Sequence, residues 1–191
     1  MRYAHPRRAV NIRGARFVPK SQQQKRSAVP TSEPTLYLLC GKIAAGKSTL
    51  AAVLAARPVT VLLSEDHWSS RLFPGELKTI EDYRRCSGRL RDAMGPHVVA
   101  LLKAGVSVVL DFPANTITLR RWMRSLFEEA DAVHELHYLD ASDESCKRRL
   151  AARNAAGEHA FQTSEADYEI FTSYFAPPSP DEGFNVVVHR E

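Results

Sequence analysis

Cysteine is scarce in this chain of 191 residues. The three cysteines, Cys40, Cys86 and Cys146, lie far apart in the sequence. An odd number at such spacing argues against a disulfide framework and against a Cys-x-x-Cys metal or redox site. We therefore expect three reduced thiols in a cytoplasmic protein.

Long hydrophobic runs are missing as well. The longest apolar runs, such as 98–102 and 108–110, are far too short to cross a bilayer. The N-terminus also lacks the charged, apolar and small-residue order of a secretory signal. We expect no membrane partner, and the content of 44% hydrophobic and 25% charged residues is that of an ordinary soluble domain.

Acidic residues are absent from residues 1–30, which hold eight basic residues. The rest of the chain has 18 basic and 22 acidic residues, a net charge of −4. A stretch rich in Arg, Gln, Ser and Pro without sustained periodicity cannot bury enough apolar surface to fold. We expect a disordered extension over residues 1–33, and a nucleic-acid-binding arm or a transit peptide are the alternatives.

Short apolar runs alternate with helical stretches over the remaining residues, 34–191. We expect strands at 35–40, 59–64, 106–110, 133–139 and 184–188, helices at 47–56, 80–93, 96–103, 116–130, 143–156 and 164–175, and a loop at 67–79. The pair Gly95-Pro96 is expected to end one helix and start the next. This alternation predicts one α/β domain with a mostly parallel sheet and helices on both faces.

Residues 41–48 read GKIAAGKS and match the pattern G-x4-G-K-[ST] between an expected strand and an expected helix. Glycines let the backbone approach a phosphate, and successive N–H groups can then point at the anion. Lys47 is predicted to reach the β- and γ-phosphates, and the Ser48 hydroxyl to bind Mg²⁺. The pattern predicts ATP and Mg²⁺ as cofactors, with nucleotide contacts from Gly41, Lys42, Ile43, Ala44, Ala45, Gly46, Lys47, Ser48 and Thr49.

Two acidic residues follow expected strands and should lie at the ligand-binding edge of a parallel sheet. Asp111 follows the third strand and could hold Mg²⁺ or contact the substrate; its alternative role is to cap a turn. Asp66 follows the second strand and can accept the proton of an attacking hydroxyl. Its neighbour Glu65 competes for that role, and we expect the two side chains to point to opposite sides of an extended segment.

The expected helix 143–156 carries Arg149 and Arg153, which are four residues apart and share one face. Two guanidinium groups on one face suit a triphosphate whose charge shifts during transfer. The alternative is a basic face in contact with solvent.

The order of these motifs resembles the small P-loop kinases of the AAA_33 and zeta-toxin-like group, which includes polynucleotide 5′-kinase and chloramphenicol phosphotransferase. The resemblance covers about residues 35–190. Four stretches are further similar to a bacterial branch of ATP-binding proteins: LDFPANT (110–116), RRW (120–122), RNAAGEHAF (153–161) and EGFNVV (182–187). One departure is Ser69, which stands where polynucleotide kinases carry an arginine three residues after the base; the nearest arginine here is Arg71.

The resemblance implies a three-layer α/β/α P-loop NTPase fold with five strands in the order 2-3-1-4-5. It also implies ATP with Mg²⁺ and transfer of phosphate to a hydroxyl group. The implied catalytic residues are Lys47, Asp66, Arg149 and Arg153. The implied Mg²⁺ residue is Ser48. We also expect Asp111 to be a metal ligand, and we expect substrate contacts from Asp66, Arg71, Asp111 and Asn115.

The hypothesis that follows is an ATP-dependent kinase that phosphorylates a hydroxyl of a small molecule. A 5′-hydroxyl polynucleotide kinase, with the basic extension as a tether, is the alternative enzyme. An ATP-binding regulator or slow NTPase without an acceptor is the alternative from another class. The segments expected to shape the acceptor pocket, 67–80 and 157–163, carry no motif that identifies the acceptor.

Overall fold

A computed structural model describes residues 33–157 and 163–191. Residues 1–32 of the expected basic extension lie outside the described residues. Residues 158–162 of the expected acceptor segment also lie outside them.

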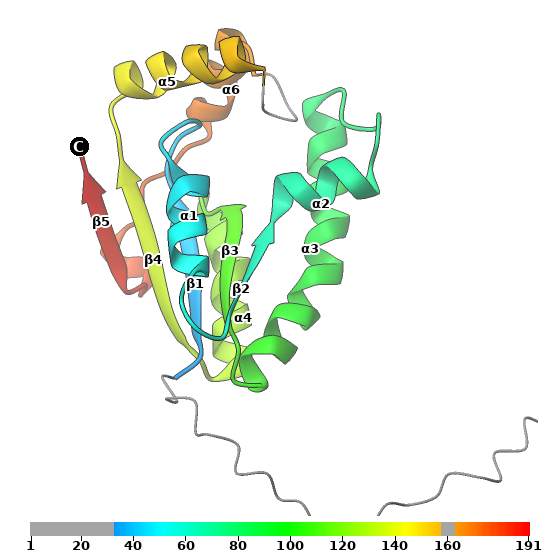
Figure 1. Cartoon of the computed structure of the whole chain (residues 1–191), viewed down its shortest axis with the longest axis vertical. Coiled ribbons are helices and arrows are strands. Elements are labelled where there is room, and N and C mark those ends of the chain that lie inside the picture. Colours follow the sequence, from blue (N-terminus) through cyan, green and yellow to red (C-terminus); the bar gives the residue numbers. More distant parts are fainter. Residues whose placement is uncertain (1–32, 158–162) are drawn as a thin grey trace, which may run out of the picture. The chain divides into compact units, whose positions relative to one another are not determined.

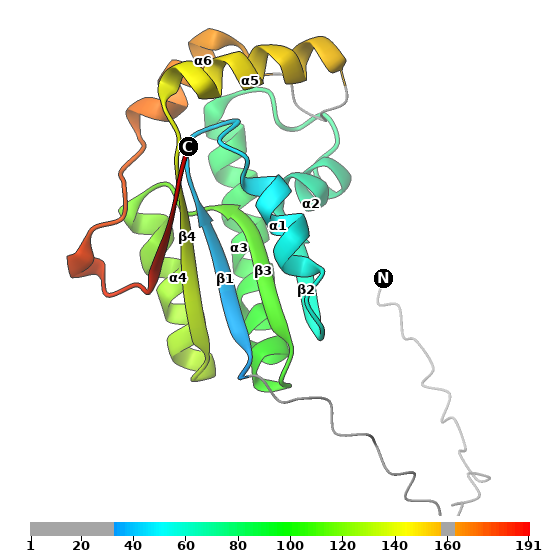
Figure 2. The same ribbon diagram turned by 60° about the vertical axis from the view of Figure 1, so that its left-hand side comes forward.

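The five strands form one sheet in the order β2-β3-β1-β4-β5, and every neighbouring pair is parallel, which confirms the predicted order (Figure 2). The strands are β1 (Thr35–Cys40), β2 (Thr60–Ser64), β3 (Ser107–Pro113), β4 (Val133–Asp140) and β5 (Val186–Arg190).

Helices cover both faces of this sheet (Figure 1). The helices are α1 (Lys47–Ala55), α2 (Glu65–Leu72), α3 (Ile80–Lys103), α4 (Ile117–Ala130), α5 (Asp143–Ala156) and α6 (Glu165–Ser173), with a short 3₁₀ turn at Pro180–Glu182. Helix α1 lies on one face, α3 and α4 lie on the other, and α5 and α6 lie beyond the carboxyl ends of the strands. No helix among the described residues is long and apolar enough to cross a membrane.

The central strand β1 is buried along its whole length, because helices cover the sheet on both sides. Its side chains alternate between two hydrophobic clusters, as the two-residue period of a strand requires. Leu36 and Leu38 pack in the cluster under α3 and α4, whereas Tyr37 and Leu39 pack against α1. The core thereby fixes the end of β1, from which the nucleotide-binding loop begins.

Residues 67–72 form most of helix α2, so the prediction of a loop over 67–79 is wrong in its first half. The helix begins directly after β2, where the Ser64 hydroxyl accepts a hydrogen bond from the backbone N–H of His67. Glu65 and Asp66 occupy the first turn, where negative charge favours a helix. Glu65 and Asp66 therefore lie in a helix. The prediction that they lie on an extended segment, with side chains on opposite sides of it, is wrong.

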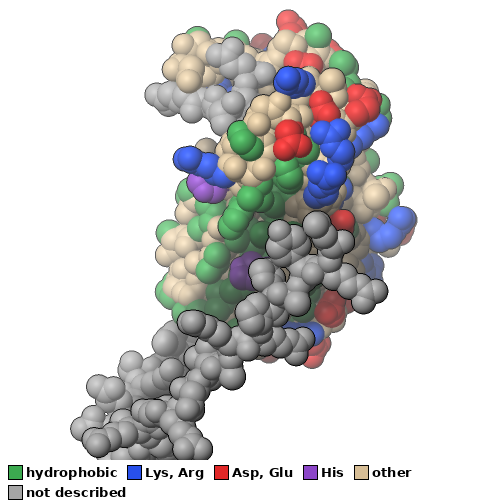
Figure 3. All heavy atoms as spheres, turned by 90° about the vertical axis from the view of Figure 1, so that its right-hand side faces the viewer, with side chains coloured by type: hydrophobic (Ala, Val, Ile, Leu, Met, Phe, Trp, Pro, Cys, Tyr) green, Lys and Arg blue, Asp and Glu red, His purple; other side chains and the backbone are tan. Residues whose placement is uncertain are grey.

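Helix α3 runs without interruption through Gly95 and Pro96, so the predicted break there is also wrong. A proline inside a helix costs about 3 kcal/mol, and packing on both sides of it offsets that cost here. Gly95 lies against Trp122 and Leu126 of α4, and the following turn buries Val98 in the core. Figure 3 looks onto the side of the domain that carries α2 and α3, where charged side chains gather beside a band of hydrophobic ones.

Candidate active site

A cleft of about 1700 Å³ lies at the carboxyl ends of the strands. Of the residues predicted to form the site, the cleft is lined by Ile43, Ala44, Ala45, Gly46, Lys47, Ser48, Thr49, Asp66, Asp111, Asn115, Arg149 and Arg153. Arg71, Gly41 and Lys42 do not line it. The structure therefore brings together most of the predicted residues, from four different elements and two loops.

The loop between β1 and α1 has a backbone shape that depends on its glycines. Gly41 has φ 153°, and a Cβ there would lie 3.0 Å from the carbonyl oxygen of Leu139. Gly46 has φ 104° and directly precedes α1. Ala44 also has a positive φ of 60°, in the left-handed region. A loop that winds in this way at a helix N-terminus suits a phosphate group.

Lys47 is half-buried, and its ammonium group is held above the loop. Its Nζ donates hydrogen bonds to the carbonyl oxygens of Gly41 at 2.7 Å and of Lys42 at 2.8 Å. Burial lowers the pKa of Lys47, and the nearby Asp111 carboxylate opposes that shift. The ammonium group is thus held against the backbone of the loop that is expected to bind an anion.

Asp111 and Ser48 are the oxygen ligands that the site offers to a cation. Burial raises the pKa of Asp111, while hydrogen bonding with Ser48 and the charge of Lys47 oppose the shift. Within the described parts of the chain, no cluster of three or more His, Cys, Asp or Glu residues could hold a metal. One carboxylate and one hydroxyl fit Mg²⁺, which takes few protein ligands and completes its shell with phosphate oxygens and water.

The two adjacent carboxylates at the start of α2 have different surroundings. Glu65 is 3% exposed, and its carboxylate accepts hydrogen bonds from Tyr83 Oη at 3.0 Å and from the Ser87 hydroxyl. Burial raises the pKa of Glu65. Asp66 is exposed and lines the cleft. Burial lowers the pKa of Lys47 and of Arg153, and the charge of Asp66 opposes both shifts. The carboxylate of Asp66 therefore lies among the groups expected to act on the phosphate.

The two arginines of α5 reach the cleft from above the loop. Arg149 donates to the carbonyl oxygen of Ala45 at 3.4 Å and pairs with Glu191 at 2.7 Å. Arg153 has a buried Nε with no hydrogen-bond partner in the described residues, and burial lowers its pKa. A buried donor of this kind is costly unless a ligand supplies an acceptor.

Lys42 connects the loop to the helices above it rather than facing the cleft. Its Nζ forms an ion pair with Asp143 at 2.7 Å, and the same carboxylate oxygen accepts a hydrogen bond from Tyr168 Oη at 2.8 Å. These contacts join the loop to α5 and α6.

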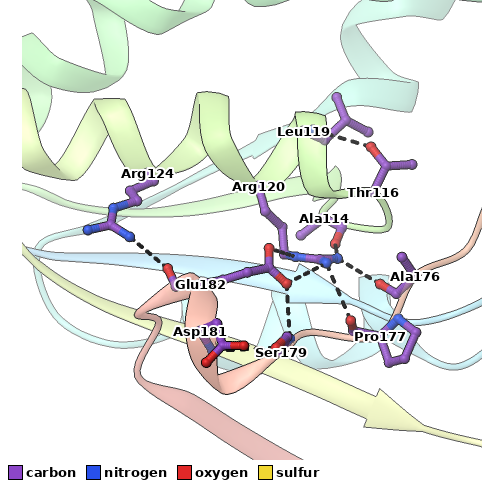
Figure 4. A network of polar contacts seen from close by, with 10 residues as sticks. All are labelled: Ala114, Thr116, Leu119, Arg120, Arg124, Ala176, Pro177, Ser179, Asp181 and Glu182. Atoms are coloured by element: carbon purple, nitrogen blue, oxygen red, sulfur yellow. Dashed lines mark hydrogen bonds and ion pairs between the residues drawn. The ribbon is translucent and has the colours of Figure 1, made fainter.

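A buried arginine supports the start of the loop, and sequence reasoning assigned it no role (Figure 4). Arg120 is fully buried and binds both carboxylate oxygens of Glu182 at 2.7 Å. It also donates to the carbonyl oxygens of Ala114 at 2.9 Å and Ala176 at 2.8 Å. Asn115 follows Ala114 in the chain, and its Oδ1 accepts a hydrogen bond from the Gly41 backbone N–H at 3.0 Å.

The position of Arg120 in α4 is a signal that could have revealed this role. It precedes Met123 and Phe127 by three and seven residues, so it lies on the apolar face of that helix. A charged residue on such a face requires a partner. The partner, Glu182, comes from a segment 62 residues away, and the sequence alone does not connect the two.

Replacing Glu182 with glutamine should lower the free energy of unfolding by about 2 kcal/mol. The substitution keeps the size of the side chain but leaves the buried Arg120 charge without an opposite charge. Chemical denaturation of the two proteins at neutral pH measures the difference.

The matched control is Glu128→Gln, which removes an exposed ion pair with Arg124 and should change stability by less than about 0.5 kcal/mol. Hydrogen bonding to Arg120 lowers the pKa of Glu182 below its ordinary value of 4.5. The loss in Glu182→Gln should therefore be complete above that pH and shrink as the pH falls below it. Equal losses in the two variants would contradict a stabilising role for the buried pair.

Comparison with known proteins identifies a family model that matches this chain and solved structures that have a similar fold. The AAA_33 family model, described as an AAA domain, matches residues 36–178. No curated protein matches the sequence.

Solved structures share the fold. A kinase candidate from Chloroflexus aurantiacus is 24% identical, with a TM-score of 0.66 over 83% of this chain and 85% of that one. Kti12 of Chaetomium thermophilum, in complex with ADP-AlF3, is 15% identical, with a TM-score of 0.62 over 81% and 88%. The APS kinase CysC of Mycobacterium tuberculosis, in complex with AMPPNP and APS, is 20% identical, with a TM-score of 0.56 over 83% and 88%. At these identities the likeness shows a P-loop kinase fold.

Proposed function

The chain belongs to the AAA_33 family of AAA domains, and on this basis we propose that it is an ATP-dependent kinase of a small-molecule hydroxyl group. The observation that carries the proposal is the shared lining of one cleft by the loop residues Lys47 and Ser48 and the carboxylates of Asp66 and Asp111. These are the groups that binding a triphosphate and removing a hydroxyl proton require.

In this proposal the backbone N–H groups of the loop and the Lys47 ammonium bind the β- and γ-phosphates. Ser48 and Asp111 would hold Mg²⁺, which when bound neutralises phosphate charge. Arg149 and Arg153 stabilise the charge that shifts during transfer. The Nε of Arg153 has no hydrogen-bond partner among the described residues, which supports this role because a phosphate oxygen would satisfy it.

The transfer step joins the acceptor oxygen to the γ-phosphorus of ATP. The bond between that phosphorus and the β,γ-bridging oxygen breaks, and its electron pair leaves with ADP. Asp66 accepts the proton of the acceptor hydroxyl in this proposal, because its side chain is exposed at the cleft, whereas Glu65 is 3% exposed.

Two residues favour a small molecule over a nucleic-acid end as the acceptor. Ser69, at the position where polynucleotide kinases carry an arginine, is 3% exposed and has no positive charge to offer a phosphodiester. Arg71, the nearest arginine, lies in the last turn of α2 and does not line the cleft.

Incubation of the full chain with [γ-³²P]ATP and Mg²⁺ tests the function. We expect label transfer to a compound in a small-molecule extract of bacterial cells, and none to a 5′-hydroxyl oligonucleotide. Label in the oligonucleotide would identify a polynucleotide kinase. ADP formation at the same rate with and without extract would identify an NTPase that has no acceptor.

A further inference from the structure

Helix α3 contributes two arginines to the part of the cleft opposite the nucleotide-binding loop. Arg84 and Arg91 both line the cleft, and they lie seven residues apart on the same face of the helix. Two helical turns separate them by about 10 Å along the axis. Neither forms an ion pair with a carboxylate in the parts of the chain that the structure describes.

The guanidinium group of Arg91 is held in place by two neighbours. It lies over the Trp122 ring, 6.0 Å from the ring centroid, and its Nη1 donates a hydrogen bond to Ser87 Oγ at 2.7 Å. An arginine has five N–H donors, and this is the one bond that Arg91 makes among the described residues. Most of its donors are therefore available to a molecule in the cleft.

Glu65 lies near Arg91 but forms no ion pair with it. Burial raises the pKa of Glu65, and the positive charge of nearby Arg91 opposes that rise. The Glu65 oxygens are bound to Tyr83 and Ser87, and Ser87 lies between Glu65 and Arg91. This wall of the cleft therefore presents, beside an aromatic ring, a guanidinium group that makes no ion pair with the described residues.

We propose that the acceptor is an anionic hydroxyl compound, and that Arg91 binds its carboxylate or phosphate group. A guanidinium group forms two parallel hydrogen bonds with either anion, and pre-positioning by Trp122 and Ser87 reduces the cost of ordering it. The inference rests on the proposed kinase function, and it narrows the acceptor to molecules with a negative charge besides the reacting hydroxyl. Arg84, exposed and stacked on Tyr174 at 5.3 Å, adds positive charge near this wall.

The test separates a bacterial small-molecule extract by anion exchange before incubation with the full chain and [γ-³²P]Mg-ATP. We expect label transfer to the anionic fraction and none to the neutral and cationic fraction. Prior treatment of the anionic fraction with a phosphatase, then removed, distinguishes the two anions: labelling is lost for a phosphate and retained for a carboxylate. Transfer to the neutral and cationic fraction would overturn the inference while leaving the kinase function intact. Transfer to neither fraction, with Mg-ATP binding demonstrated, would overturn both.

Variants of α3 supply the second measurement. With the purified labelled acceptor, Arg91→Gln should raise KM at least about tenfold with little change in kcat, and Arg91→Lys should restore part of the affinity. The matched control is Arg89→Gln, which removes an exposed arginine of the same helix that does not line the cleft. We expect unchanged Mg-ATP affinity in all three variants, and this measurement verifies that each variant is folded. Equal KM values for Arg91→Gln and Arg89→Gln would contradict the assignment of Arg91.

Discussion

Lys47→Ala should reduce ATP turnover by about a thousandfold and weaken Mg-ATP binding, while the domain stays folded. The ammonium group is held by the carbonyl oxygens of Gly41 and Lys42, in the loop that we propose binds phosphate. Removing one pre-positioned donor from a charged transition state typically costs about 10²–10³ in rate, and here ground-state binding of the triphosphate is lost as well. Steady-state kinetics and a nucleotide-binding titration measure the two effects.

The fold should survive this substitution, because burial already disfavours the charged form of Lys47. Lys103→Ala is the matched control, since Lys103 is half-exposed at the end of α3 and pairs with Glu129 at 3.9 Å. It should keep normal turnover. Wild-type ATP turnover in Lys47→Ala would contradict the kinase function and the P-loop mechanism together.

The sheet could be predicted from sequence because its strands are short apolar runs that alternate with helices. The order of its strands came from the resemblance to P-loop kinases. The loop at 41–48 could be predicted because its glycine spacing and its Gly-Lys-Ser ending form a local pattern between a strand and a helix. Such features depend on nearby residues, and one chain carries enough information to place them.

Helix α2 was missed although its start had a local signal. Ser64 followed by Glu65 and Asp66 is a capping residue before an acidic first turn. The continuity of α3 through Pro96 had no such signal. It depends on the packing of Gly95 against Trp122, a contact between helices that no local pattern records.

The largest gap between sequence and structure concerns residues that act at a distance. Arg120 and Glu182 are 62 residues apart, yet their ion pair fixes the segment that holds Gly41. Arg91 belongs to a polar helix in the sequence, and only the packing of α3 against Trp122 places it at the cleft. Such roles arise from tertiary contacts, so the structure is needed to find them.

Asp66→Asn should slow phosphate transfer to the true acceptor by at least about a hundredfold, with near-normal Mg-ATP affinity. Asparagine keeps the size and some hydrogen bonding of the side chain but cannot accept the hydroxyl proton. General-base assistance contributes about 10²–10⁴ in rate, or roughly 3–5 kcal/mol of barrier. Single-turnover transfer and an ATP-binding titration separate this effect from the loss in Lys47→Ala, which should affect both quantities.

Glu65→Gln decides between the two neighbouring carboxylates, and the structure changes what we expect from it. Because Glu65 is buried and bound to Tyr83 and Ser87, its replacement should lower stability while the surviving folded protein transfers phosphate normally. Transfer rates must therefore be divided by the concentration of folded protein, measured by ATP binding. A large rate loss in Glu65→Gln alone would assign the base to Glu65. Normal transfer in both variants would show that neither carboxylate is needed to remove the proton.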